Sequence, residues 1–294
     1  MIRTDRRSVL TGLGALGVMG CSPALRDLMD FSGEMKTLEA RHGGRLGVAV
    51  STTGRTFAHR PDERFVYCST FKMYLAAAIL ERIQRGEENL DRTVPVTRSD
   101  MVSHAPVTEP AIGSSLSIET LCKAVVEVSD NPAANILIRE LGGIGALRAW
   151  YRSIGDQSTT VDRLEPMMNR VDGDKDTITP TQSVANMQRL FISADTPLTP
   201  ESKARLLGWM FDSPTGAARI KAGVPAGWRV AHKTGTGGYG PTNDIGVIYP
   251  PAADPIVLAV YFHATEASTP AQREAVIADA TRTVLKALGH GEAA

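Results

Sequence analysis

Hydrophobic and polar residues alternate with a short period near both ends of the chain, and with a helical period in its middle. A period of two is typical of strands that bury one face, whereas apolar residues three and four positions apart favour a helix. Two strand-like segments flank Thr53 and Gly54, which predicts a hairpin. The predicted strands are residues 46–51, 55–59, 228–232, 244–249 and 256–263.

Helices are predicted before, between and after these strands. Residues 25–41 have a helical period that ends at a pair of glycines. A last helix is predicted to begin at Thr269, which a proline follows, and to run to Leu288. Thr179 and Thr199 also precede prolines, a pattern typical of helix starts because the first turn has no use for the missing N–H.

Strands at both ends of a chain with helices between them predict an α/β (α+β) fold, with an antiparallel sheet flanked by helices and an all-helical domain. We expect residues 22–60 and 212–294 to form the sheet domain, and residues 61–211 to form the helical one.

Composition and charge exclude some classes of function. The chain has 294 residues, 43% of them hydrophobic, which is enough to bury a sizeable core in one or two domains. Its 32 basic and 32 acidic residues balance, and they form no basic stripe, so we predict no nucleic-acid partner. The histidines and cysteines lack the spacing of metal ligands, so we predict no metal site and no cofactor.

The first 21 residues are typical of an export signal. Arg6 and Arg7 form a twin-arginine-like pair ahead of a short apolar stretch, which is too short to span a membrane. The segment ends in a pattern similar to a bacterial lipobox, so Cys21 is either a lipid attachment point or an incidental cysteine of an ordinary cleaved signal. We expect an exported protein that is periplasmic or associated with the cell envelope.

Ser69 and Lys72 are the first candidate catalytic pair. Ser69 lies just before the apolar helical run 73–80, and residues three apart share one face of a helix, so Lys72 is expected beside it. A serine hydroxyl becomes a good nucleophile only when a neighbouring base takes its proton. The alternative interpretation is a serine that caps the helix and a solvated lysine.

Three further motifs follow in order along the chain. They are Ser129-Asp130-Asn131, the segment from Arg163 through Glu165 to Asn169, and Lys233-Thr234-Gly235-Thr236. Taken together with the Ser69 segment, they resemble the motif set of class A serine β-lactamases, and the resemblance covers essentially the whole mature chain. In that family the active site lies in a cleft between a sheet domain and a helical domain.

The resemblance implies hydrolysis of the β-lactam amide bond, and hence resistance to β-lactam antibiotics. Ser69 would be acylated, and Ser129 would pass a proton to the departing lactam nitrogen. Glu165 would act as the general base that activates water for deacylation, with Asn169 holding the other side of that water. Whether Lys72 or Glu165 accepts the first proton stays open.

The same resemblance implies a set of substrate-binding residues. Lys233, Thr234, Gly235 and Thr236 would receive the carboxylate and main chain of the substrate from a strand. Asn131 would hold Lys72 and the side-chain amide of the substrate. Relatives complete the carboxylate site with an arginine on the next strand, where this chain has Thr242, or at a position that matches Arg219. His104 lies where relatives often carry an aromatic residue and is a further candidate for substrate contact.

Some positions depart from the family. Cys68 and Cys122 lack the partners with which relatives form disulfides, so we expect free, buried thiols. The stretch from Asn169 to Asp176 is shorter than usual, although Arg163 is expected to pair with Asp176. The substrate spectrum and inhibitor sensitivity are not evident from the motifs.

The expected partner is a small β-lactam bound by a monomer. Two other interpretations remain: a penicillin-binding D,D-peptidase, and a β-lactam sensor that is acylated and then stops.

Overall fold

The computed structural model describes residues 23–238, 240–265 and 267–290. The predicted export segment, residues 1–21, and the possible lipid attachment point Cys21 lie outside the described residues. Within the described part of the chain, every helix is too short or too polar to cross a bilayer.

Five antiparallel strands form the central sheet, in the order β2-β1-β9-β8-β7. The strands are β1 (Gly44–Thr52), β2 (Arg55–His59), β7 (Arg229–Thr236), β8 (Pro241–Tyr249) and β9 (Ile256–Ala264). All five strand predictions are therefore confirmed, and Gly54, with φ +75°, makes the turn of the first hairpin. The last strand, β9, pairs with β1, so the two ends of the chain meet in one sheet.

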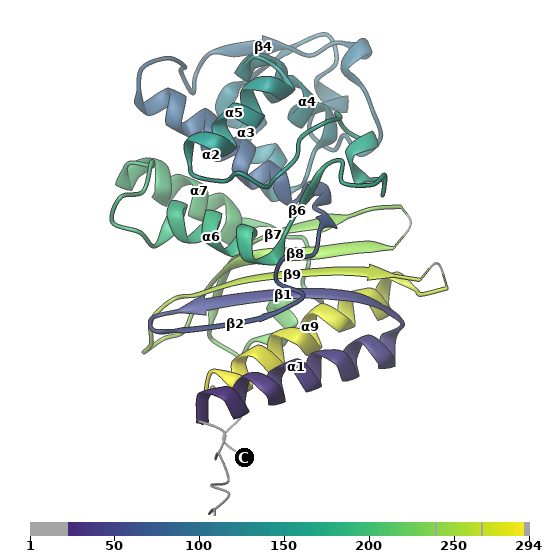
Figure 1. The fold of residues 1–294 in the computed structure, drawn as a ribbon. Helices are drawn as coiled ribbons and strands as arrows, with labels where there is room; N and C mark the ends of the chain where they lie inside the picture. The colour runs from purple at the N-terminus through teal and green to yellow at the C-terminus, as the bar shows by residue number, and fades with distance from the viewer. Residues whose placement is uncertain (1–22, 239, 266, 291–294) are drawn as a thin grey trace, which may run out of the picture.

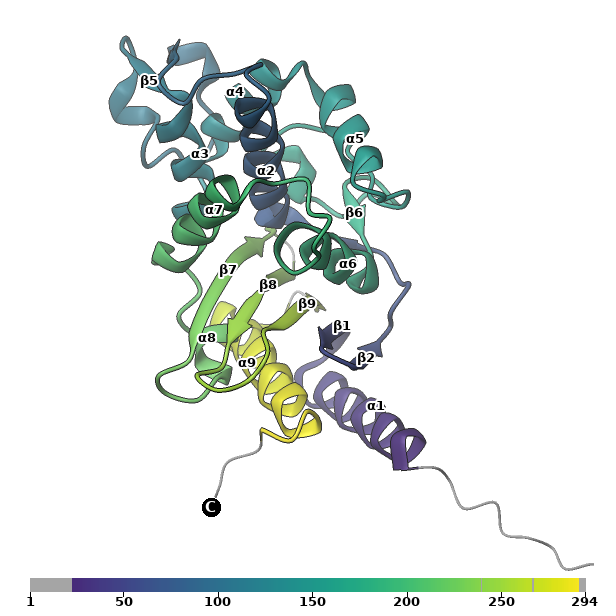
Figure 2. The ribbon, with the colours of Figure 1, turned by 90° about the vertical axis from the view of Figure 1, so that its left-hand side faces the viewer.

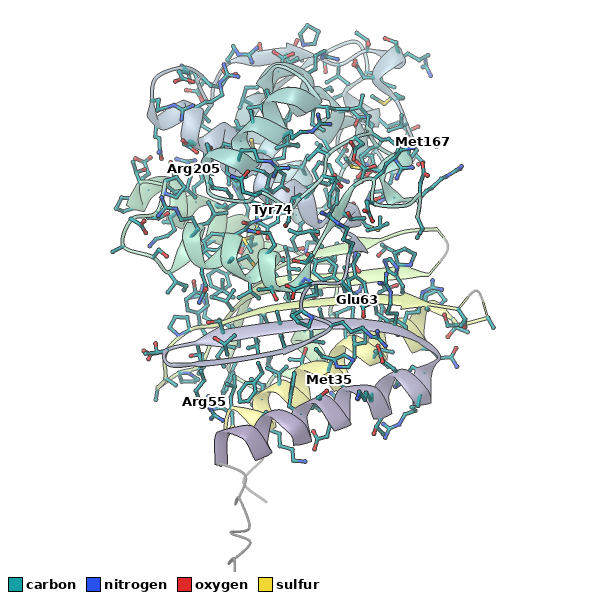
Figure 3. The ribbon with its side chains drawn as sticks, in the orientation of Figure 1. Met35, Arg55, Glu63, Tyr74, Met167 and Arg205 are labelled. Atoms are coloured by element: carbon teal, nitrogen blue, oxygen red, sulfur yellow. The ribbon has the colours of Figure 1, made fainter. Side chains whose placement is uncertain are left out.

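One face of this sheet is covered by the two terminal helices, α1 (Pro23–His42) and α9 (Pro270–Ala287), as Figure 1 shows. Alternate residues of β1 and β9, such as Val48 and Val260, join residues of both helices in one hydrophobic core. Met35 on α1 is fully buried in it (Figure 3). Every second residue of the strands and every third or fourth residue of the helices therefore point into this one core.

The other face of the sheet carries the helices from the middle of the chain. They are α2 (Phe71–Gln84), α3 (Ile118–Glu127), α4 (Asn131–Leu141), α5 (Ile144–Ser153), α6 (Pro180–Phe191) and α7 (Pro200–Asp212). Helix α2 is the centre of this second core, and every residue from 71 to 80 is buried. Tyr74 on this helix is among them (Figure 3). Helix α6 packs on β1 and β9, and α7 packs on β7 (Figure 2).

Residues 61–211, which were expected to be helical throughout, also contain two short antiparallel ladders. One joins β3 (Phe65–Val66) to β6 (Thr177–Ile178), and the other joins β4 (Thr93–Pro95) to β5 (Ser115–Ser117). These segments are too short to show a period in the sequence, because each pairs over only two or three residues. The first ladder fixes the chain just before Ser69.

The threonines predicted at helix starts are confirmed as caps. The side chains of Thr179, Thr199 and Thr269 accept hydrogen bonds from backbone N–H groups in the first turns of α6, α7 and α9. Each cap satisfies a donor that the helix itself leaves free, which contributes about 1 kcal/mol.

Candidate active site

Ser69 lies in a single turn of 3₁₀-helix, η1 (Cys68–Thr70), that leads directly into α2. Strand β7 approaches this turn so closely that a Cβ on Gly235 would lie 2.7 Å from the carbonyl oxygen of Tyr67. The side chain of Asn243, on β8, donates to the same carbonyl at 3.1 Å. The sheet therefore supports the turn that carries Ser69. Strand β7 can come this close to the turn only because Gly235 has no side chain. Ser69 keeps 8% of its surface exposed.

Lys72 is the centre of the candidate site. Its ammonium nitrogen lies 3.0 Å from Ser69 Oγ and 3.0 Å from Glu165 Oε1. It also donates to Asn131 Oδ1 at 2.5 Å and to the Ser129 carbonyl at 2.7 Å. Burial lowers the pKa of Lys72 below its ordinary value, while the neighbouring Glu165 carboxylate acts in the opposite direction. The predicted neighbourhood of Ser69 and Lys72 is confirmed, and Lys72 is fully buried rather than solvated.

Glu165 reaches the same centre from a loop. Its Oε1 lies 3.5 Å from Ser69 Oγ, and its Oε2 accepts a hydrogen bond from Asn169 Nδ2. Asn135 on α4 bonds to both the N–H and the C=O of Glu165, at 3.0 Å each. Asn135 is not part of any of the motifs, although it lies four residues after Asn131 and hence on the same helix face.

The loop that carries Glu165 and Asn169 is closed by an ion pair. Arg163 Nε lies 2.5 Å from Asp176 Oδ2, which confirms the predicted pair. The other oxygen of Asp176 accepts from the backbone N–H groups of Asp162 and Arg163, and Tyr67 donates its hydroxyl to it. Arg163 also donates to the carbonyl of Arg170. The loop is therefore tied both to itself and to the residue two positions before Ser69.

Ser129 is presented by a tight turn. It has φ +62°, and its hydroxyl accepts from Lys233 Nζ at 3.1 Å and lies 3.3 Å from Lys72 Nζ. The following Asp130 is fully buried and accepts from the backbone and hydroxyl of Thr108 and from the N–H of Ala133. Asp130 is thus the cap of α4, and it stabilises the turn that presents Ser129.

Asn131 and His104 lie side by side at the start of α4. Asn131 accepts from Lys72 with its oxygen, and its Nδ2 donates to the Ser103 carbonyl at 2.7 Å. One amide N–H is therefore already used within the protein. The backbone of His104 also bonds to Asn131, but its imidazole lies 2.8 Å from the Val128 carbonyl and contacts none of the predicted catalytic side chains.

Lys233 faces Ser129 from strand β7. Its ammonium donates to Ser129 Oγ and, at 2.9 Å, to the carbonyl of Thr234. Burial and then repulsion by Lys72 lower the pKa of Lys233 well below its ordinary value. The hydroxyl of Thr234 lies 3.1 Å from that of Thr215. Two lysines with lowered pKa values therefore flank one serine hydroxyl.

Arg219 is folded against the end of the same strand. Its guanidinium donates to the carbonyls of Gly235 and Asn243, at 3.1 and 2.9 Å, and to the Thr236 hydroxyl at 2.8 Å. Glu274 on α9 accepts from its Nε at 3.1 Å. Arg219 is 7% exposed, so it is a buried residue of the site and not a surface arginine.

Both described cysteines are free and buried, as predicted. Burial raises the pKa values of the Cys68 and Cys122 thiols, which keeps them in the unreactive protonated form. Within the described residues, no group of three or more histidines, cysteines or carboxylates is arranged to hold a metal ion.

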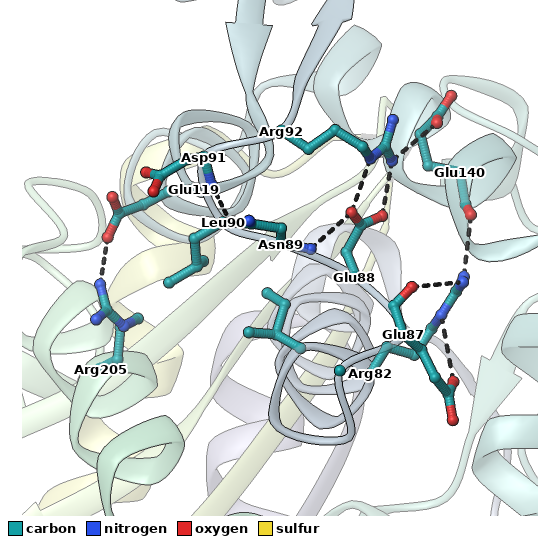
Figure 4. Close-up of a pocket in the computed structure, with 12 residues that line it drawn as sticks. Arg82, Glu87, Glu88, Asn89, Leu90, Asp91, Arg92, Glu119, Glu140 and Arg205 are labelled. Carbon is teal, nitrogen blue, oxygen red and sulfur yellow. Dashed lines mark hydrogen bonds and ion pairs between the residues drawn. The ribbon is translucent and has the colours of Figure 1, made fainter.

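A large cavity lies at the opposite end of α2 from Ser69. It has a volume of about 960 Å³ and is surrounded by arginine–carboxylate pairs such as Arg92 with Glu88, and Arg205 with Glu119 (Figure 4). These charges are already paired, and the cavity contains no serine or cysteine nucleophile. The candidate active site is therefore the cluster around Lys72 and not this cavity.

Comparisons with known proteins show the family of this chain. The model of the β-lactamase enzyme family matches residues 30–288. Beta-lactamase FAR-1 of Nocardia farcinica is 41% identical, over 87% of this chain and 82% of its own length. Beta-lactamase CTX-M-8 of Citrobacter amalonaticus is 36% identical, over 95% of this chain and 96% of its own.

Solved structures give the same result. An ancestral class A β-lactamase superposes with a TM-score of 0.84 at 46% identity, over 87% of this chain and 99% of that one. A β-lactamase from Xanthomonas campestris superposes with a TM-score of 0.85 at 37% identity, over 90% of this chain and 99% of that one. By sequence, by fold and by the groups that meet at Lys72, this chain belongs to the β-lactamase enzyme family, among its class A serine enzymes.

Proposed function

We propose that the protein hydrolyses the amide bond of β-lactam antibiotics through an acyl-enzyme on Ser69. One observation carries this proposal: a single ammonium, that of Lys72, lies 3.0 Å from the Ser69 hydroxyl and 3.0 Å from the Glu165 carboxylate. The arrangement supplies a nucleophile and two possible bases within hydrogen-bond reach of each other.

In the acylation step, Ser69 Oγ would attack the lactam carbonyl carbon and lose its proton. Lys72 at 3.0 Å and Glu165 at 3.5 Å are both near enough to accept that proton, directly or through one water. Lys72 can accept it only as a neutral amine, which its lowered pKa favours. When the carbon–nitrogen bond breaks, the nitrogen would take a proton from the Ser129 hydroxyl, which Lys72 and Lys233 resupply.

In the deacylation step, Glu165 would take a proton from a water that attacks the ester carbonyl. Asn169 donates to one oxygen of Glu165, and its own Oδ1 is buried without a hydrogen-bond partner among the described residues. That oxygen suits a second contact to the attacking water. The ester bond to Ser69 Oγ then breaks, and the serine recovers its proton.

The substrate carboxylate would be held at the end of β7. Lys233, Thr234 and Thr236 offer one ammonium and two hydroxyls there, and Gly235 leaves space for the main chain of the substrate. Arg219 would contribute to this site in two ways: it donates a hydrogen bond to the Thr236 hydroxyl, and it adds a second positive charge.

Two residues at the start of α4 would contact the substrate side chain. The second amide N–H of Asn131 would donate to it, because the first is used by Ser103. His104 is exposed at the same place, with its ring held by Val128.

The protein would act outside the cytoplasm as a monomer. The twin-arginine-like segment in residues 1–21 supports export, and Cys21 supports attachment to a lipid at the cell envelope. Mass spectrometry of the mature N-terminus tests this part: a diacylated Cys21 supports the lipid anchor, and an unmodified N-terminus contradicts it.

We retain the division of the chain into a sheet domain, residues 22–60 and 212–294, and a helical domain, residues 61–211. One observation supports it: the hydrophobic core between the sheet and the terminal helices is built only from described residues of 31–57 and 220–288. The other core is shared between the sheet and residues 61–211.

A chromogenic cephalosporin tests the function. We expect sustained turnover by the wild-type protein, whereas a D,D-peptidase or a sensor would give one burst equal to the amount of protein. The Glu165→Ala variant should accumulate a covalent adduct on Ser69, visible as a mass increase of the intact protein. Ser69→Ala is the matched control and should form no adduct. Normal turnover by Glu165→Ala would contradict the assignment of the base.

A further inference from the structure

A buried imidazole–carboxylate pair lies within the sheet, and its histidine precedes Lys233 in strand β7. His232 Nδ1 lies 3.0 Å from both Oδ1 and Oδ2 of Asp244, and both residues are completely buried. Strands β7 and β8 bring them together, because Asp244 pairs with Thr234 in the register and His232 pairs with Gly246. A Cβ on Gly246 would lie 2.9 Å from the Cβ of His232, so the glycine provides the room for the ring.

This His232–Asp244 pair connects the sheet to the segment that carries Arg219. Asp244 Oδ2 accepts the backbone N–H of Ile220 at 3.1 Å, one residue after Arg219 and at the start of the short helix α8 (Ile220–Gly223). Figure 2 shows α8 beside β7 and α9. On the other edge of the imidazole, a Cβ on Gly216 would lie only 2.9 Å from His232 Cε1. The ring is therefore enclosed between the sheet and the turn that precedes Arg219.

The Asp244 carboxylate is also a buried negative charge among several cations. It attracts the Lys233 and Lys221 ammonium groups, and it opposes the lowering of the Lys233 pKa by burial and by Lys72. Glu165 acts in the same direction as Asp244, whereas Arg219 acts in the opposite one. A buried carboxylate is costly without hydrogen bonds. Asp244 receives such bonds from His232 and from the backbone N–H of Ile220.

We propose that His232 and Asp244 are positioning residues that fix Arg219 at the end of β7 and hold Lys233 as a cation for binding the substrate carboxylate. This inference rests on the proposed carboxylate site. Neither residue touches the substrate, and both act through Lys233 and Arg219. The sequence gives no sign of this role, because a histidine inside a strand is usually a packed core residue.

Two versions of one chromogenic cephalosporin test the proposal: the free carboxylic acid and its neutral methyl ester. For Asp244→Asn, kcat/KM on the acid should fall by about 10-fold, mainly through KM, because the hydrogen bonds to this side chain lose their charged acceptor. On the ester, which carries no negative charge, the same variant should lose less than about 2-fold. Equal losses on both substrates, or no loss on the acid, would overturn the proposal.

A matched pair of variants at His232 isolates the hydrogen bond. His232→Ala removes the donor to Asp244 and should behave like Asp244→Asn. In His232→Asn the amide nitrogen lies near the place of Nδ1, so kcat/KM on the acid should return to within about 3-fold of wild type. If Asp244→Asn does not fold, as judged by circular dichroism, this pair decides the question, since an equal loss in both His232 variants would also contradict the proposal.

The pH dependence of kcat/KM gives a second measurement, which would not change if Asp244 had only a structural role. Without the Asp244 charge, Lys233 should lose its proton more easily, so the alkaline limb of kcat/KM on the acid should move to lower pH in Asp244→Asn. An unchanged limb would contradict the proposal. Failure of the carboxylate site itself would be recognised separately, because wild-type enzyme would then show equal kcat/KM on acid and ester.

Discussion

Asn135 holds Glu165 by both of its main-chain groups, accepting from the N–H and donating to the C=O at 3.0 Å each. A side-chain amide can pair with a backbone in this way because it offers one donor and one acceptor side by side. Asn135 lies on α4, the helix that begins with Asn131. The same helix therefore positions two groups that contact Lys72, namely the amide of Asn131 and the carboxylate of Glu165.

We predict that Asn135→Ala slows deacylation more than acylation. The change removes two hydrogen bonds and releases the backbone of Glu165, so kcat should fall by about 10- to 100-fold, a loss typical of misplaced catalytic groups. Rapid-mixing kinetics should show a burst followed by a slow steady state, with acyl-enzyme detected by mass spectrometry. Asn89→Ala, on the loop after α2, is the control and should keep normal kinetics. An unchanged kcat in Asn135→Ala would show that the loop holds Glu165 without this contact.

The alkaline limit of activity should depend on Lys233. Because burial and Lys72 lower its pKa well below the ordinary value, the positive charge that attracts the substrate is lost as pH rises, earlier than for an exposed lysine. An arginine stays charged at all accessible pH values. In Lys233→Arg the alkaline limb of kcat/KM should therefore move to higher pH, measured between about pH 6 and 10. A limb that stays in place would assign the titration to another group, such as Lys72.

The ion pair of Arg163 with Asp176 should govern both the stability and the order of the Glu165 loop. Asp176 is fully buried, so Arg163→Ala leaves an unpaired buried carboxylate, with an expected loss of about 3 kcal/mol in the free energy of unfolding. Urea denaturation measures this loss, and kcat should fall in parallel because the loop carries Glu165. Lys123→Ala removes a surface ion pair to Glu127 and should cost about 0.5 kcal/mol or less. Equal effects of the two variants would contradict a special role for Asp176.

Glu39 should contribute acid-sensitive stability on the opposite side of the sheet. Burial alone would raise its pKa, but hydrogen bonds from Arg60 and from the Leu46 N–H outweigh it, and the net pKa lies below the ordinary value. A lowered carboxyl pKa adds stability above the pKa of the unfolded chain, and this is lost as pH falls through the folded pKa. Glu39→Gln should therefore cost about 1–3 kcal/mol at neutral pH, and less below about pH 4.

Glu34→Gln is the matched control for this change, because Glu34 lies on the same helix with an exposed side chain paired to Lys286. Its loss should be about 0.5 kcal/mol or less at any pH. Urea denaturation at neutral and acid pH compares the two variants. A pH-independent cost for Glu39→Gln would mean that the charge is unimportant and only packing is lost.

Several features of this protein are already determined by its sequence, because each depends on residues close together in the chain. The spacing of Ser69 and Lys72 puts them on one helix face, the threonine–proline pairs begin helices, and alternation defines the strands. The order of the motifs also predicted the family, and the pair of Arg163 with Asp176 was expected within the loop between them. Strands of only two or three residues are too short to show a period, which is why the two short ladders were not predicted.

The tertiary structure alone decided which distant groups share a charge or a hydrogen bond. Ser69 and Glu165 are 96 positions apart, and only folding brings them to 3.5 Å. The hold of Asn135 on Glu165 and the pair of His232 with Asp244 depend on side-chain direction, which spacing does not reveal. The lowered pKa values of Lys72 and Lys233 need complete burial, and that of Lys233 also needs Lys72 nearby, because desolvation and repulsion act over distances that only packed side chains reach.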